Sequence, residues 1–107
     1  MLAEAVATAN KAGIDTAILQ DVLASGGGAG VVLDRMTPYM LNEDIGAFSF
    51  SLANSAKDMG YYTQMCKDLG AADSIASAVN SLYAEQVDGG HGEAYVPLLI
   101  KLLENNR

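Results

Sequence analysis

The stretch that decides the fold, residues 48–70, reads FSFSLANSAKDMGYYTQMCKDLG. Apolar or small side chains recur in it three or four residues apart, which places them on one side of a helix: Leu52, Ala56, Met59, Thr63, Cys66 and Leu69. Ser51 can cap the start of this helix, because its hydroxyl can accept a hydrogen bond from an amide of the first turn. Gly70 can end the helix in a left-handed conformation. The stretch is therefore predicted to form a long amphipathic helix.

A second face of this helix is polar, and it carries Asn54, Lys57, Tyr61 and Gln64. Lys57 adjoins Asp58 in sequence, so the two side chains point about 100° apart on a helix and do not pair across a turn. By its chemistry alone, Lys57 is interpreted as an exposed charge, and Asp58 as a partner for a nearby donor. Gly60 lies mid-helix, where glycine costs about 1 kcal/mol relative to alanine. We therefore expect another group to approach the backbone closely at Gly60.

The rest of the chain also shows helical periodicity, interrupted by glycine, proline and capping residues. The further predicted helices are residues 1–12, ended by Gly13; a helix capped by Asp15, with Ile18, Leu19, Val22 and Leu23 facing inward; a helix from Gly30 or Val31 to Leu41, bent by Pro38; a helix capped by Asp73 or Ser74, with Ile75, Ala78, Val79, Leu82 and Tyr83 facing inward; and a closing helix over residues 97–103. Residues 42–49 are predicted to form a loop and residues 88–92 a turn. No segment shows the alternation of a strand. The sequence predicts an all-α fold, a bundle of about six helices forming a single domain over residues 1–107.

Composition excludes several classes of function. A net charge of −7 and only six Lys and Arg residues, scattered along the chain, argue against nucleic-acid binding. No apolar run approaches the length of a membrane span, and the first residues do not resemble a signal peptide, so we expect a cytoplasmic protein. Cys66 is the single cysteine, which excludes an internal disulfide and a cysteine-based zinc site. It is interpreted as a small buried hydrophobe, and no metal site is predicted.

Two glycine-rich segments invite a functional interpretation. The loop over residues 26–30 resembles a phosphate-binding turn before a helix, but the dinucleotide fingerprint also needs a preceding strand. We interpret this loop as a helix connection. His91 lies in the second segment, and without a catalytic partner at a defined spacing it is interpreted as a solvated surface residue.

Three segments resemble the β-hydroxyacid dehydrogenase family, to which 3-hydroxyisobutyrate dehydrogenase belongs. Residues 50–60 match the pattern F-x-L-x-x-x-x-K-D-L-G of that family, with Met59 in place of its leucine. Residues 3–5 and 11–15 resemble its A-E-A…K-A-G-L-D, and residues 99–104 resemble its L-I-K-L-L-E. The order and spacing of these matches extend the resemblance over nearly the whole chain. It is a resemblance to the all-helical C-terminal domain, whose fold is like that of the C-terminal domain of 6-phosphogluconate dehydrogenase.

The resemblance implies a function shared with a second domain. The parent enzyme would transfer a hydride between NAD or NADP, bound mainly by an N-terminal Rossmann domain absent from this chain, and a small hydroxy acid or semialdehyde. Lys57 would reach the dinucleotide, where its ammonium complements the phosphates. Phe50 would help to wall the nicotinamide pocket, with ordinary core packing as the alternative. The family's catalytic lysine, in a K-x-x-x-N pattern, is expected upstream of this chain, so no catalytic residue is assigned here.

The resemblance also implies a homo-oligomer, since in the family this domain builds the dimer interface. The alternative from a different class is a non-enzymatic helical interaction or oligomerisation module that shares the sequence pattern.

Overall fold

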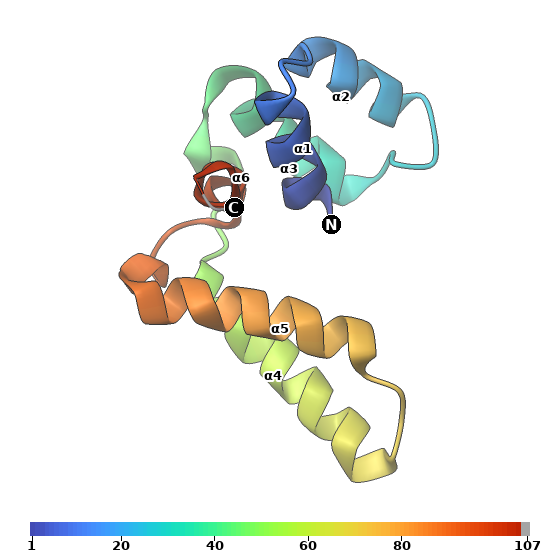
Figure 1. Ribbon diagram of the computed structural model, residues 1–107, viewed down its shortest axis with the longest axis vertical. Coiled ribbons are helices and arrows are strands. Elements are labelled where there is room, and N and C mark those ends of the chain that lie inside the picture. Colours follow the sequence, from blue (N-terminus) through green and yellow to red (C-terminus); the bar gives the residue numbers. More distant parts are fainter. Residues whose placement is uncertain (106–107) are drawn as a thin grey trace. The chain divides into compact units, whose positions relative to one another are not determined.

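The computed structural model of the protein describes residues 1–105, which form six α-helices and no β-strand (Figure 1). The predicted all-α fold is therefore confirmed. The helices group into two compact units, one made of Met1–Ser49 with Pro97–Arg107 and the other of Phe50–Val96. We call them the first unit and the second unit. The expectation that the chain is a single domain stays a prediction.

The first unit contains α1 (Leu2–Lys11), α2 (Thr16–Ala24), α3 (Val31–Asn42), the 3₁₀ turn η1 (Ile45–Ala47) and α6 (Leu99–Glu104). In it α1 packs against α6, and α2 contacts both α1 and α3. Its buried apolar side chains come from α1, α3 and α6: Ala3, Val6, Ala7, Ala9, Leu33, Met36, Tyr39, Leu99 and Ile100. The helix α2 contributes no fully buried residue, so the core of this unit is made by three of its four helices.

Local sequence explains where these helices start and stop. Asp15 caps α2 as predicted, because its Oδ1 accepts hydrogen bonds from the amides of Ala17 at 2.8 Å and Ile18 at 3.4 Å. The helix α3 continues past Pro38 to Asn42, one residue beyond the predicted end. Pro97 lies buried in a 3₁₀ turn, η3 (Val96–Leu98), that leads directly into α6.

The second unit is a helical hairpin in which α4 (Leu52–Leu69) and α5 (Ser74–Gln86) run side by side in opposite directions (Figure 1). The ends of α4 are those that the sequence predicts. The hydroxyl of Ser51 accepts a hydrogen bond from the amide of Asn54 at 3.1 Å, and Gly70 adopts a φ of 66°. The helix α5 is followed by a π-helical turn, η2 (Val87–His91), in which Gly90 has a φ of 93°.

Backbone hydrogen bonds join the two ends of the second unit. The amide of Val96 donates to the carbonyl of Phe50 at 2.8 Å, and the amide of Leu52 donates to the carbonyl of Ala94 at 2.8 Å. The amide of Ala53 donates to the carbonyl of Gly92 at 2.9 Å. The segments before α4 and after η2 therefore lie against each other, and they fix the position of the first turn of α4.

Several expectations about packing are wrong, and one of them concerns Ala78 of α5, which is exposed although it was expected to face inward. Ile18 and Val22 of α2 are 62% and 63% exposed, Leu69 is 73% exposed, and Ile75 is 81% exposed. Helical periodicity identifies an apolar side of a helix, but it cannot say whether another element covers that side, and no element of the described chain covers these four side chains. Nor does any group approach Gly60, where a built Cβ would meet no atom within 4 Å.

No helix in the part of the chain that the structure describes is long and apolar enough to cross a membrane.

Candidate functional site

The polar face of α4 is exposed as the sequence predicts. Four of its side chains project from successive turns of this helix: Asn54, Lys57, Tyr61 and Gln64. On the side that packs within the hairpin, Leu52, Thr63 and Cys66 are buried. The burial of Cys66, which is 3% exposed, confirms its interpretation as a small hydrophobe. The two sides of α4 thus separate packing from polar chemistry.

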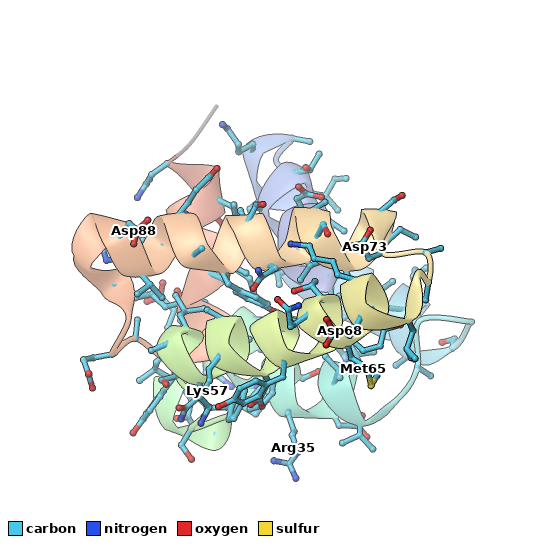
Figure 2. The ribbon with its side chains drawn as sticks, turned by 90° about the horizontal axis from the view of Figure 1, so that it is seen from below. Arg35, Lys57, Met65, Asp68, Asp73 and Asp88 are labelled. Atoms are coloured by element: carbon cyan, nitrogen blue, oxygen red, sulfur yellow. The ribbon has the colours of Figure 1, made fainter. Side chains whose placement is uncertain are left out.

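Lys57 lies in the second turn of α4, and Figure 2 shows it on the side of this helix turned away from α5. Its side chain is exposed, and its ammonium has no hydrogen bond or ion pair with any residue in the described range 1–105. Asp58 is exposed as well and also lacks a partner in that range, so the expected structural role of Asp58 is wrong. An ammonium with three unused donors is suited to an anionic ligand such as a phosphate.

Phe50 lies two residues before the first residue of α4 and is half-buried. Its carbonyl accepts the hydrogen bond from Val96, which fixes the backbone at this position. Phe50 is therefore a partly accessible residue whose backbone is held in place. The structure puts both predicted cofactor-contacting residues, Phe50 and Lys57, in the second unit near the N-terminal end of α4; their proposed roles stay predictions.

An open cavity of about 470 Å³ lies at the far end of the same hairpin, where α5 begins. It is lined mainly by apolar side chains, among them Met59, Tyr62, Ile75 and Val79, and neither Lys57 nor Phe50 is among its lining residues. Tyr62 is one of these lining residues, and a hydrogen bond with the Cys66 thiol raises its pKa. Asp73 and Ser74 also line this cavity, so its lining is mainly but not wholly apolar, and we assign it no ligand.

A second cavity, of about 240 Å³, lies in the first unit and is lined by polar and apolar side chains of α1, α3 and α6. Tyr39, Glu43 and Glu104 are among its lining residues. This cluster was not predicted from the sequence. Tyr39 and Glu43 lie one helical turn apart at the end of α3, but Glu104 is far from both in the chain, so only the packing of the helices brings it to the same cavity.

The two glycine-rich segments behave as connections. Residues 26–30 join α2 to α3, and no strand precedes them in the described chain, so the dinucleotide fingerprint lacks its structural context. His91 is exposed at the end of η2, as predicted. The described residues contain no group of three or more His, Cys, Asp or Glu side chains that could hold a metal ion.

Comparison with known proteins supplies the family. Comparison with curated proteins gave no match. Comparison with protein families matches residues 1–103 to a family described as NAD-binding of NADP-dependent 3-hydroxyisobutyrate dehydrogenase. The match extends over nearly the whole chain, and the helical structure fits a helical domain of that family. The chain belongs to the family of NAD-binding domains of NADP-dependent 3-hydroxyisobutyrate dehydrogenases.

Proposed function

We propose that this chain is the helical C-terminal domain of an NAD(P)-dependent β-hydroxyacid dehydrogenase. In the whole enzyme it closes the active-site cleft, contacts the cofactor and mediates assembly into a dimer in the cytoplasm. The substrate is a small hydroxy acid or semialdehyde. The observation that supports this most directly is Lys57, an exposed ammonium without a partner among the described residues, on a helix of an NAD-binding family.

The residues present fit a dinucleotide phosphate better than they fit the reacting atoms. Lys57 supplies positive charge, and Phe50 supplies part of an aromatic wall at the start of the same helix. A nicotinamide dinucleotide supplies the hydride-transfer chemistry when it is bound. The role of this chain is to bind and orient the dinucleotide. Its described residues offer no paired acid and base beside Lys57.

The alternative function is a non-enzymatic helical interaction module. It is favoured by the apolar side chains that the structure leaves uncovered, of which Ile18, Val22, Leu69 and Ile75 are between 62% and 81% exposed. Such uncovered apolar faces are typical of protein–protein contact surfaces.

The Lys57→Ala variant distinguishes the two functions. In a two-domain enzyme that contains this chain, the substitution should raise the KM for the cofactor by about one to two orders of magnitude, because a charge-assisted contact of about 1.5–3 kcal/mol is lost. The free energy of unfolding of the chain should change by less than about 0.5 kcal/mol, as expected for an exposed side chain. Steady-state kinetics and urea unfolding measure the two effects.

Lys67→Ala is the matched control, since Lys67 is also an exposed lysine of α4, in its last turn. It should leave the KM for the cofactor unchanged. Equal kinetics for the two variants would reject the cofactor role of Lys57 and favour the interaction module. The isolated 107-residue chain should show no oxidation of hydroxy acids with NAD or NADP, and turnover by that chain alone would contradict the proposed division of labour.

A further inference from the structure

The cavity of about 240 Å³ in the first unit combines two carboxylates with a buried phenol. Glu43 lies at the C-terminal end of α3, and Glu104 is the last residue of α6. Tyr39, from the last turn of α3, is only 8% exposed. All three residues line one cavity.

Tyr39 is more than nine-tenths buried as a whole residue, and its hydroxyl has no hydrogen-bond partner in the described range 1–105. It is not fully enclosed, since no buried side-chain oxygen or nitrogen of the described residues lacks a partner. The hydroxyl is therefore accessible, on a residue that lines the cavity. Its pKa is raised first by burial and then by the negative charges of Glu43 and Glu104.

Hydrogen bonds hold one of the carboxylates in place. The side-chain amide of Asn10 donates to Oε1 of Glu104, and its carbonyl oxygen accepts from the hydroxyl of Thr16 at 3.1 Å. Both ends of the Asn10 amide are thus used, and the second carboxylate oxygen of Glu104 keeps its acceptor capacity. Glu43 is exposed and its carboxylate has no partner among the described residues.

The helices add negative potential to the same place. Asn10 lies in the last turn of α1, and Tyr39 and Met40 lie in the last turns of α3. The C-terminal end of a helix carries a partial negative charge and favours cations. A cation in this cavity would thus meet two carboxylates, a phenol oxygen and the ends of two helices.

The chemistry of the lining selects the kind of cation. The described acidic side chains do not form a group that could hold a metal ion. The cavity offers acceptor oxygens on three residues, Tyr39, Glu43 and Glu104. Their number matches the three N–H donors of a primary ammonium. The side chains of Val6, Met40 and Ile100 line the rest of the cavity and provide apolar surface for a short alkyl chain.

We infer that this cavity is a binding site for a short primary alkylammonium, whose ammonium group donates to Tyr39, Glu43 and Glu104. The site is independent of the proposed cofactor contact at Lys57, which lies in the other unit. Lys101 also lines the cavity and is exposed. Its ammonium opposes a second cation there, so it limits the affinity of the site.

The test titrates the full chain with n-butylammonium chloride near neutral pH, at constant ionic strength, and follows the ring signals of ¹³C-labelled tyrosine by NMR. The Tyr39 signals should move in a saturable manner. Tetramethylammonium has the same charge but no N–H donor, and it should produce no saturable shift. Absence of a saturable shift with n-butylammonium, or equal shifts with both cations, would overturn the inference.

Variants locate the site. Glu43→Gln should weaken the affinity by about tenfold or more, because a hydrogen bond to a charged group is lost. Glu85→Gln is the matched control: it removes the same charge from an exposed position on α5 and should bind as the wild type does. Lys101→Met should bind more tightly than the wild type. Equal affinities of the Glu43 and Glu85 variants would reject the site, and because Glu43 is exposed, its substitution should not prevent folding.

Discussion

At the scale of the residue, Tyr39 of the first unit is a buried tyrosine whose surroundings change its pKa. Tyr39 is buried in the first unit, and its hydroxyl has no hydrogen-bond partner among the described residues. Burial and the neighbouring charges both oppose ionisation of the phenol, which raises its pKa above the ordinary value of 10.0. Tyr83 of α5 has a pKa raised by burial alone.

The raised pKa of Tyr39 predicts a loss of stability in alkali. Below about pH 10 the tyrosine is protonated in both the folded and the unfolded chain, so it contributes nothing to the pH dependence. Above about pH 10 the unfolded chain releases this proton first, and the free energy of unfolding falls as the pH rises through the raised pKa of the folded state. Tyr39→Phe should therefore reduce the alkaline loss of stability, measured by urea unfolding at neutral and alkaline pH.

Tyr61→Phe is the control for this prediction, since Tyr61 is 68% exposed. It should keep the alkaline loss of stability of the wild type. Part of that loss should remain in Tyr39→Phe as well, because the pKa of Tyr83 is also raised. Identical alkaline curves for the wild type and Tyr39→Phe would show that the pKa of Tyr39 is not raised in the folded chain.

At the scale of the element, α4 is defined by its two ends more than by its middle. The Ser51 hydroxyl and the left-handed Gly70 satisfy backbone groups that a helix end would leave unpaired. Hydrogen bonds from Leu52 and Ala53 to the segment after η2 secure the first turn. Gly60 lies between these ends with open space on its Cα, so nothing in the described chain compensates for its cost to the helix.

The two glycines of α4 predict opposite effects of the same substitution. Gly60→Ala should raise the free energy of unfolding by about 0.5–1 kcal/mol, the difference between the two residues inside a helix. Gly70→Ala should lower it by about 1–2 kcal/mol, because Gly70 has a φ of 66°, which side chains disfavour. A built Cβ meets no atom within 4 Å at either position, so clashes do not confuse the comparison.

Urea unfolding of both variants measures these effects, and each variant is the control for the other. A loss of stability in Gly60→Ala would contradict the open space at Gly60 and would mean that another group packs against the helix there. No change in Gly70→Ala would mean that α4 can end without a left-handed residue.

At the scale of the whole molecule, charge and apolar exposure oppose each other. A net charge of −7 keeps chains apart. Against this, both units expose large apolar side chains, and full burial of one such side chain is worth about 1.5–3 kcal/mol. Several of them in one contact outweigh the repulsion, which salt also screens.

We therefore expect the chain to self-associate, more strongly as the salt concentration rises. Sedimentation velocity at high micromolar concentration should show species larger than the 11.1 kDa chain. Paired serine substitutions locate the contact, one variant carrying Ile18→Ser with Val22→Ser and the other Leu69→Ser with Ile75→Ser. One of the two should return the protein to a monomer, and a wild type that is monomeric under all conditions would contradict the prediction.

Much of the architecture follows from the sequence by itself. The periodicity of residues 48–70, the cap at Ser51 and the stop at Gly70 specify α4, because these signals act within one helix and need no partner. For the same reason the exposure of Lys57 was predictable: it lies beside the apolar stripe of its own helix. The short motifs also pointed to the family that the comparison shows.

Only the tertiary structure decided which apolar faces are covered. Ile18 and Leu69 lie on sides that a helical pattern marks as inward, yet no other element of the described chain packs over them. Tertiary packing likewise assembled Tyr39, Glu43 and Glu104 around one cavity. The physical reason is the same in both cases: burial and side-chain clusters depend on contacts between residues far apart in the chain, whereas helix propensity and capping depend only on neighbours.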